Sequence, residues 1–298
     1  MKRISTKVEL WAQGQDDESH IARCARVCYA SQATGTDTAL IQSLVNRKHL
    51  SMFRHSTYYF YLPKGHKMSA GIILYLQSNP YYGCVRITSR KRKDKDIASP
   101  VFLALNGQFV LEHERLCHRL SEYSVSEAYY IRMAKELPIA WRQAVLMTVR
   151  ITVCCTTQIA TSRELNRKSP NAIAEQSTRY VNFNKHGGQI CICEPKIFKS
   201  LQRKHQWAMR FAWWVAEKSY LYLTRHGMQP QHARGVLPLE TATKVVYTYS
   251  CKEWHDIFDL RLRGTTGAPH PDAKELCQLI LIEMKAFIPF IAEGIIEV

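Results

Sequence analysis

The stretch 164–180, ELNRKSPNAIAEQSTRY, concentrates charged and hydroxyl-bearing side chains around a Pro-Asn break. Guanidinium groups, hydroxyls and backbone N–H groups freed at a turn are the parts from which phosphate-binding sites are built. A charged surface turn between two helices would have the same composition. The residues alone therefore leave two interpretations open, an anion-binding loop or a solvated turn. The cations and hydroxyls concerned are Arg167, Lys168, Arg179, Ser169 and Ser177.

The same stretch resembles the signature of the flavin-dependent thymidylate synthases, Arg-His-Arg-x-x-Ser-x-Asn-Glu-x-Ser-x-Arg-Tyr, when this signature is placed over 167–180. The half that resembles the nucleotide-phosphate site is intact, whereas the half that resembles the flavin site is changed. The matching positions are Arg167, Glu175, Ser177, Arg179 and Tyr180. The signature His, second Arg, Ser and Asn are replaced by Lys168, Ser169, Ala172 and Ala174.

Three further segments resemble blocks of the same family and occur in the family's order. The first is 49–60, HLSMFRHSTYYF, which resembles a His-x-Ser-Pro-x-Glu-His-x-x-Phe-x-Phe block. Its matching positions are His49, Ser51, His55 and Phe60, and Met52 and Arg54 replace the Pro and the Glu. An ordinary strand entry would also explain this segment, because Tyr58, Phe60 and Leu62 alternate with the period of a strand.

The other two blocks lie near the C-terminus. The spacing from Arg234 to Arg261 matches the spacing in the family without a gap. Segment 228–238, MQPQHARGVLP, resembles Glu-x-Ala-Arg-x-x-Leu-Pro, with Gln231 in place of the Glu. Segment 250–261, SCKEWHDIFDLR, resembles Asn-x-Arg-Ser-x-x-Asn-Phe-x-x-Leu-Arg. The matching positions are Ala233, Arg234, Leu237, Pro238, Leu260 and Arg261. Ser250 and Asp256 replace the two Asn residues, and Lys252 replaces the first Arg.

The resemblance implies a role for each matched position. Residues Ser177, Arg179 and Arg234 are expected to hold the phosphate of a deoxyuridine nucleotide. Arg261 is the predicted catalytic residue, because its counterpart favours the deprotonated pyrimidine N3 and so raises the electron density at C5. The predicted substrate-binding residues are Glu164, Arg167, Glu175, Gln176, Ser177, Arg179, Arg234 and Arg261. The predicted cofactor-binding residues are His49, Ser51, Arg167, Lys168, Ser169, Glu175, Ser250 and Asp256.

The implied activity is a flavin-dependent transfer of a one-carbon unit to C5 of a pyrimidine nucleotide, most simply dUMP to dTMP. FAD would be the cofactor, with methylenetetrahydrofolate and NADPH as co-substrates, and the enzyme would be a homotetramer. The changes at Lys168, Ser169 and Asp256 predict weak or altered FAD binding. Two alternatives stay open: a divergent paralogue acting on another pyrimidine nucleotide, and a non-catalytic relative that binds nucleotides or nucleic acid.

The expected fold is α+β, with one domain over 1–298, a central sheet with packed helices, and an inserted subdomain at about 63–150. Periodicity predicts strands over 6–12, 58–62 and 191–193. It predicts helices over 20–31, 37–49, 109–120 and parts of 125–149. A long helix over 195–226 should end at Gly227, and its apolar side should face the core. That apolar side comprises Phe198, Leu201, Trp207, Phe211, Trp214 and Leu221.

The overall composition sets limits on partners and location. Lys and Arg outnumber Asp and Glu by 41 to 25, which favours anionic partners or simply a basic surface. The basic run 90–95, RKRKDK, follows Tyr81 and Tyr82 and favours a solvated loop over nucleic-acid binding. The ten cysteines match neither a zinc framework nor a disulfide scaffold, so no metal site is predicted. With no signal peptide and no membrane span recognisable, a cytoplasmic location is expected.

Overall fold

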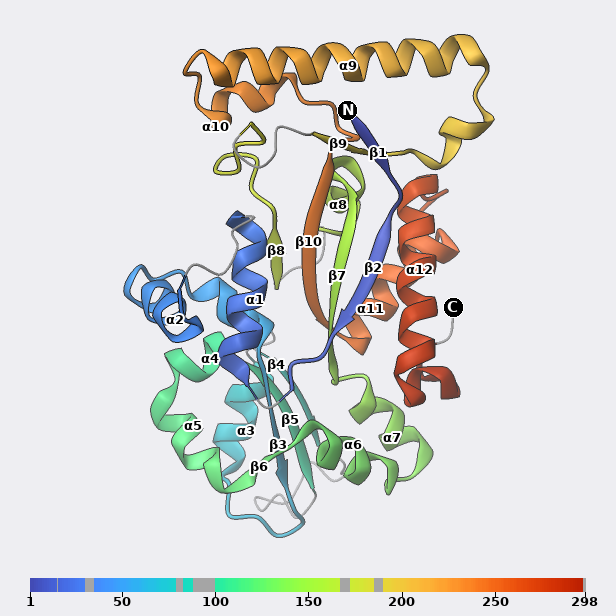
Figure 1. Cartoon of the computed structure of the whole chain (residues 1–298). Helices are drawn as coiled ribbons and strands as arrows, with labels where there is room; N and C mark the ends of the chain where they lie inside the picture. The colour runs from blue at the N-terminus through green and yellow to red at the C-terminus, as the bar shows by residue number, and fades with distance from the viewer. Residues whose placement is uncertain are drawn as a thin grey trace.

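The computed structural model describes residues 1–14, 16–29, 35–78, 83–87, 100–166, 172–184 and 190–296 (Figure 1). Its centre is a four-stranded sheet in the order β2-β7-β10-β8, in which all neighbours are antiparallel. The strands are β2 (Lys7–Trp11), β7 (Arg150–Gln158), β8 (Ile173–Glu175) and β10 (Ala242–Ser250). The predicted strand over 6–12 is confirmed by β2. The two long central strands, β7 and β10, are not among the elements predicted from periodicity.

Helices cover both faces of this sheet because successive residues of β7 and β10 point to opposite sides. One face carries Cys154 and Val246 and packs against α1 (Asp17–Tyr29). The other face carries Val153, Cys155 and Tyr247 and forms the main core. The elements around that core are α8 (Ile159–Leu165), α11 (Cys251–Phe258), the π-helix η5 (Asp259–Arg263) and α12 (Pro271–Phe287).

A second four-stranded sheet lies at the other end of the molecule from the long helix (Figure 1). Its order is β4-β5-β3-β6, and its own core contains Phe60, Leu103 and Phe109. The strands are β3 (Thr57–Leu62), β4 (Gly83–Ile87), β5 (Val101–Asn106) and β6 (Ser124–Val125). The helices of this region are α3 (Ala70–Gln77), α4 (Gly107–Glu112), α5 (Glu114–Leu120), α6 (Glu127–Lys135) and α7 (Ile139–Leu146). The predicted insertion at about 63–150 supplies three of these four strands, and its status as an insertion stays a prediction.

The helices predicted in the N-terminal part are present. The helix predicted over 20–31 is α1, which begins earlier, at Asp17. The next is α2 (Asp37–Asn46), whose N-cap is Thr36, since this side chain accepts a hydrogen bond from the N–H of Ala39. A short 3-10 helix, η1 (Leu50–His55), follows α2 and leads into β3. These elements place the start of the block 49–60 beside α1, with which η1 is in contact.

The long C-terminal helix differs from its prediction in start and in orientation. Residues Lys196–Ser200 form a separate 3-10 turn (η3), and α9 runs over Arg203–Arg225, because Leu201 is extended and interrupts the helix. Gly227 follows α9 with a φ of 87°, which agrees with the predicted end of the helix. The buried residues of α9 are Trp213, Tyr220 and Leu221. The predicted inward stripe is therefore correct only in part: Phe198 and Leu221 are buried, whereas Trp207, Phe211 and Trp214 are 68%, 52% and 52% exposed.

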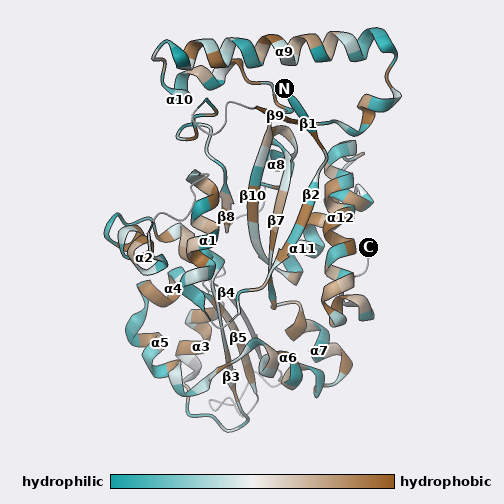
Figure 2. Ribbon diagram, in the orientation of Figure 1, coloured by the Kyte–Doolittle hydropathy of each residue, from teal (hydrophilic) through white to brown (hydrophobic). Residues whose placement is uncertain are grey.

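Hydrophobic and hydrophilic residues are mixed along α9, the uppermost helix in Figure 2. Trp207 stacks on Phe211 with ring centroids 5.5 Å apart, so the stripe forms a continuous aromatic surface. Beneath α9, strand β1 (Lys2–Ile4) pairs in parallel with β9 (Cys191–Cys193), which confirms the predicted strand over 191–193. The short helix α10 (Pro230–Ala233) and the turn η4 (Arg234–Val236) follow α9.

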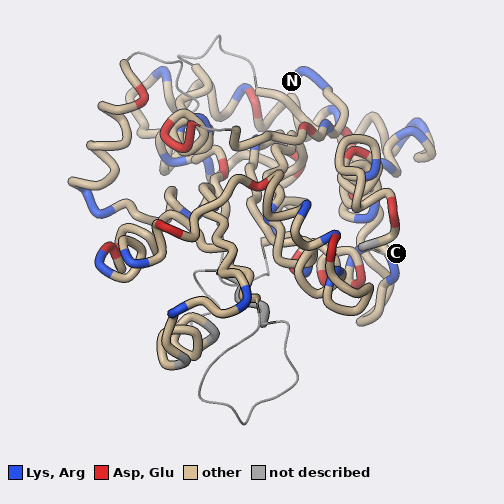
Figure 3. Tube along the Cα trace, turned by 90° about the horizontal axis from the view of Figure 1, so that it is seen from below, with Lys and Arg blue, Asp and Glu red and all other residues tan. Residues whose placement is uncertain are grey.

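Charged residues of both signs are interspersed along the described chain (Figure 3). The basic run 90–95 and its neighbours Tyr81 and Tyr82 lie outside the described residues. Nine described cysteines are free thiols. No helix in the described ranges is long and apolar enough to cross a membrane.

Candidate functional site

A cavity of about 500 Å³ opens beside the end of β8 and brings three separate segments of the chain together. Helix α8 supplies Ile159 and Arg163 to one wall. The end of β8 and the residues after it form a second wall, and the segment after α10 forms the third. The second wall consists of Glu175, Gln176, Ser177 and Thr178, and the third of Arg234, Gly235, Leu237, Pro238 and Leu239.

Backbone hydrogen bonds fix the wall that follows β8. The N–H of Gln176 donates to the carbonyl of Lys244 on β10 at 2.8 Å. The next N–H, of Ser177, donates to the carbonyl of Cys28 at the end of α1, also at 2.8 Å. This backbone is anchored on both the sheet and α1, so the Ser177 hydroxyl has a defined place at the cavity.

Glu175 is held by two side chains of the α8 region that sequence reasoning did not identify. The Ser162 hydroxyl donates to Glu175 Oε1 at 2.7 Å, and Asn166 Nδ2 donates to Oε2 at 3.3 Å. The neighbouring residue Arg163 lines the cavity and is exposed. The helical spacing of Ser162 and Asn166 was the available signal for a shared partner, but it does not reveal which strand lies opposite.

Arg234 is the cation that the fold brings to this cavity from the C-terminal blocks. Its Nη1 donates to the Thr178 hydroxyl at 3.2 Å, and it forms no ion pair within the described part of the chain. A guanidinium and two hydroxyls, of Ser177 and Thr178, thus surround a space of nucleotide size. This group of donors is suited to a phosphate ester.

Arg179 lies outside the wall of the cavity. Its guanidinium lies over the exposed ring of Tyr180, with the carbon Cζ 5.4 Å from the ring centroid. Its backbone N–H donates to the Ser177 hydroxyl at 3.2 Å. Arg179 is thus not among the residues that line the cavity, although it and Arg234 are both expected at one phosphate. Three other predicted residues, Arg167, Lys168 and Ser169, lie outside the described residues.

Arg261, the predicted catalytic residue, is bound to another predicted site residue, Glu164. Its Nε and Nη2 donate to the backbone carbonyl of Glu164 at 3.1 and 2.9 Å, and Nη2 lies 3.0 Å from Glu164 Oε2. The side chain of Arg261 is 13% exposed. Its Nη1 has no hydrogen-bond partner among the described residues. The arrangement ties η5 to the end of α8, and neither Arg261 nor Glu164 is among the residues that line the cavity.

The described cofactor-binding candidates lie on different sides of the central sheet. His49 and Ser51 are exposed beside η1, which contacts α1 on one face. Ser250 is buried and caps α11, where it exchanges hydrogen bonds with Glu253 in a capping box. Asp256 pairs with Lys252 on α11, on the other face. Of the predicted cofactor-binding residues, Arg167, Lys168 and Ser169 lie outside the described residues, so the flavin site stays a prediction.

His55, from the same block as His49, is completely buried and belongs to a hydrogen-bonded network inside the fold. Its Nδ1 is 2.8 Å from the Thr248 hydroxyl, which is 2.8 Å from the Thr152 hydroxyl on the neighbouring strand. Thr152 in turn contacts His20 Nε2 of α1 at 3.3 Å. Burial lowers the pKa of His55 to about 3 and also lowers the pKa of His20. His55 is therefore a neutral core residue that joins η1, the sheet and α1.

Comparisons with known proteins give a family and two structural similarities. The chain is similar to two crystal structures of the UMP/dUMP methylase PolB from Streptomyces cacaoi, one with 5-Br dUMP and one with 5-Br UMP. In both alignments the sequences are 16% identical and 98% of this chain is covered. The alignments cover 96% and 94% of the PolB chains, with TM-scores of 0.43 and 0.44. A sequence comparison with curated proteins finds no match.

The family match covers most of the chain and includes all the walls of the cavity. The family described as "Thymidylate synthase complementing protein" matches residues 9–68 and 112–290. The residues between the two matched ranges fall within the predicted insertion. The chain belongs to this family, that of the flavin-dependent thymidylate synthases, and is an enzyme of the thymidylate synthase-like methyltransferase type.

Proposed function

We propose that this protein transfers a one-carbon unit to C5 of a pyrimidine nucleotide, most simply converting dUMP to dTMP with methylenetetrahydrofolate. The observation that carries the proposal is the cavity at which Ser177, Thr178 and Arg234 meet. These donors come from segments far apart in the sequence, and the fold of a thymidylate synthase family member gathers them. The remaining space in the cavity suits the sugar and the base.

The chain's own residues bind and orient the nucleotide. Arg234 and the two hydroxyls hold the phosphate by charge-assisted hydrogen bonds. Glu175, held by Ser162 and Asn166, presents a fixed acceptor at the wall. The Nη1 group of Arg261 donates to the pyrimidine and stabilises negative charge at N3, while Glu164 holds the rest of the guanidinium in place. A fixed donor costs no reorganisation when the charge develops.

The same proposal includes FAD as the cofactor, NADPH as a co-substrate and a homotetramer as the assembly. In this proposal the flavin site draws on residues from more than one protomer. The aromatic face of α9, formed by Trp207, Phe211 and Trp214, supports such an assembly, because burying it in a second copy would remove a large apolar surface from water. A cytoplasmic location also stays a proposal.

A second candidate function is a relative that binds nucleotides without catalysis. It is favoured by the cofactor positions, because Ser250 caps its own helix and Asp256 pairs with Lys252. A protein of this kind would keep the cavity at Arg234 and bind no flavin.

A third candidate function is catalysis at the same cavity on a pyrimidine nucleotide other than dUMP. Nucleic-acid binding is the least favoured version, since only the basic run 90–95 and the overall positive charge of the chain motivate it.

Two measurements on the purified protein test the proposal. The first is the absorbance between about 350 and 500 nm after incubation with FAD and gel filtration, which reports flavin uptake. The second is the release of tritium from dUMP and UMP labelled at C5, with FAD, methylenetetrahydrofolate and NADPH present. Flavin uptake together with tritium release supports the enzyme. A colourless, inactive protein that still binds nucleotides in calorimetry supports the second candidate function, a relative that binds nucleotides without catalysis. A protein that binds neither dUMP nor UMP overturns both candidate functions.

A further inference from the structure

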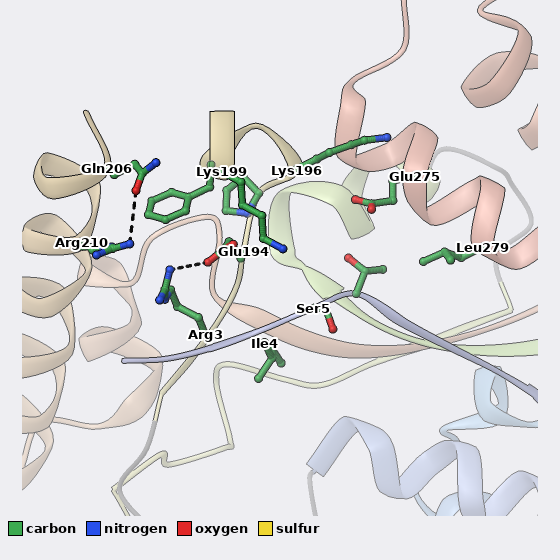
Figure 4. Close-up of a pocket in the computed structure, with 13 residues that line it drawn as sticks. Arg3, Ile4, Ser5, Glu194, Lys196, Lys199, Gln206, Arg210, Glu275 and Leu279 are labelled. Carbon is green, nitrogen blue, oxygen red and sulfur yellow. Dashed lines mark hydrogen bonds and ion pairs between the residues drawn. The ribbon is translucent and has the colours of Figure 1, made fainter. Parts of the chain in front are cut away.

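A second cavity, of about 890 Å³, lies under α9 and is separate from the candidate nucleotide site (Figure 4). It is enclosed by β1, the segment 194–199, α9 and α12, and it shares no lining residue with the cavity at Arg234. Its volume falls within the range of about 300–1,000 Å³ that is typical of small-molecule sites. The charged residues of its wall are Arg3, Lys196, Lys199, Arg210, Glu194 and Glu275.

The cations of this wall outnumber the carboxylates by four to two, so the wall is net positive. Arg3 Nη1 pairs with Glu194 Oε2 at 2.7 Å. Lys196, Lys199 and Arg210 form no ion pair within the residues that the structure describes. Figure 4 shows Lys199 reaching into the space between Glu194 and Glu275. Several positive charges around one space repel each other, and an anion in that space would relieve the repulsion.

Two of the guanidinium groups are held in place by one buried aromatic ring. Cζ of Arg3 and Cζ of Arg210 lie 5.6 and 5.4 Å from the ring centroid of Phe198. Phe198 is 1% exposed and packs against Trp213 of α9, with ring centroids 5.2 Å apart. The only hydrogen bond described for the Arg210 guanidinium is a long one of 3.5 Å to Gln206 Oε1. Arginines fixed in this way lose little freedom when they bind a phosphate in two-point fashion.

We propose that this cavity is a second ligand site, which binds a small phosphate ester carrying hydroxyl groups, such as a sugar phosphate. Arg210 and Lys199, which form no ion pair among the described residues, provide the phosphate end together with Arg3, whose guanidinium also binds Glu194. Glu275, on the α12 wall opposite, accepts hydrogen bonds from the hydroxyl groups. A continuous nucleic-acid backbone fits less well, because Glu194 and Glu275 would repel a second and third phosphate.

The test uses ribose 5-phosphate and inorganic phosphate as probes in isothermal titration calorimetry. The protein carries Arg234→Ala, which removes the cation of the other cavity, so that heat of binding reports on the site under α9. Arg210→Gln in this background should weaken both probes by about tenfold or more, since a charge-assisted contact is lost. Glu275→Gln should weaken ribose 5-phosphate and leave inorganic phosphate unchanged or tighter. Lys218→Gln, the same charge change on α9 away from this cavity, is the matched control and should change neither.

Three results would overturn the proposal. One is the absence of binding of ribose 5-phosphate to the Arg234→Ala protein. Another is equal weakening by Lys218→Gln and Arg210→Gln, which would mean that only the net charge of α9 matters. A third is displacement of ribose 5-phosphate by a single-stranded oligonucleotide with steep salt dependence, which would make the surface a nucleic-acid groove. Circular dichroism melting curves confirm that each variant is folded, and because Arg234 is absent throughout, the outcome does not depend on the proposed function.

Discussion

The substitution Arg261→Lys distinguishes two roles of Arg261: the structural contacts to Glu164 and the predicted action on the pyrimidine. Lysine keeps the positive charge and an ion pair with Glu164 Oε2, but it loses the paired Nε and Nη2 contacts to the Glu164 carbonyl. The loss of these two contacts to one carbonyl, discounted for the 30% exposure of Glu164, lowers the free energy of unfolding by about 1–2 kcal/mol. For a chain of this size that corresponds to a fall in Tm of about 2–6 °C.

The effect of Arg261→Lys on catalysis should be much larger than its effect on stability. The single oriented donor at N3 is lost, so kcat should fall by at least about a hundredfold. The affinity for dUMP should change by less than about threefold, because Arg234 still binds the phosphate. Calorimetric unfolding gives Tm, and tritium release with titration of dUMP gives kcat and the nucleotide affinity.

Two variants make this prediction refutable. Arg263→Lys is the same substitution on the same π-helix; Arg263 is 44% exposed and pairs with Asp259 at 3.2 Å, so Tm and kcat should barely change. Glu164→Gln removes the ion pair and leaves Arg261 in place, so Tm should fall by a similar amount and kcat by less than about tenfold. If Arg261→Lys and Glu164→Gln lower kcat equally, Arg261 acts only by positioning α8. If kcat of Arg261→Lys stays within a few-fold of the native protein, Arg261 is not catalytic.

Three other predictions concern the phosphate, the buried histidines and the surface of α9. Arg234→Ala should weaken dUMP binding in calorimetry by about 2–4 kcal/mol with little change in Tm, and an unchanged affinity would place the phosphate elsewhere. Because the pKa of His55 is about 3 in the folded chain and about 6.5 when unfolded, its contribution to stability is complete above pH 6.5 and is lost as the pH falls. Urea unfolding should therefore show a slope of about 1.4 kcal/mol per pH unit between pH 4 and 6 from this residue, which His55→Asn should remove; an unchanged slope would contradict the assignment. Charged substitutions at Trp207 and Trp214 should lower the mass measured by sedimentation, whereas a native protein that sediments as a monomer would refute self-association through α9.

The sequence alone was sufficient for the family and for the N-terminal elements. Blocks that match in the right order, with Arg234 and Arg261 at a fixed separation, identify the family because each block depends on local residue identity. The helix α2 was predictable from the capping residue Thr36, and β2 from alternation of buried and exposed side chains. Gly227 marked the end of α9 because its positive φ suits glycine.

The two central strands could not be predicted from alternation. Strand β7 is buried along most of its length, so the side that carries Thr152 and Cys154 is nearly as buried as the side that carries Val153 and Cys155, and the contrast between its two sides is weak in the sequence RITVCCTTQ. Periodicity was also insufficient for α9. Its periodicity identifies the apolar stripe with Trp207 and Phe211, but a period does not specify what covers that stripe, and the protomer buries the face with Trp213 instead.

The organisation of the site was decided by tertiary structure. Arg261 and Glu164 are 97 residues apart, and either could have paired with a closer charge. They meet because η5 and α8 both pack on the core-facing side of the central sheet. Likewise, the sequence marks Ser177 and Arg234 as candidates, while the register of β8 on β10 and the turn after α10 bring them to one cavity. Side-chain chemistry is local and can be read from the sequence, whereas convergence depends on long-range packing that no local pattern encodes.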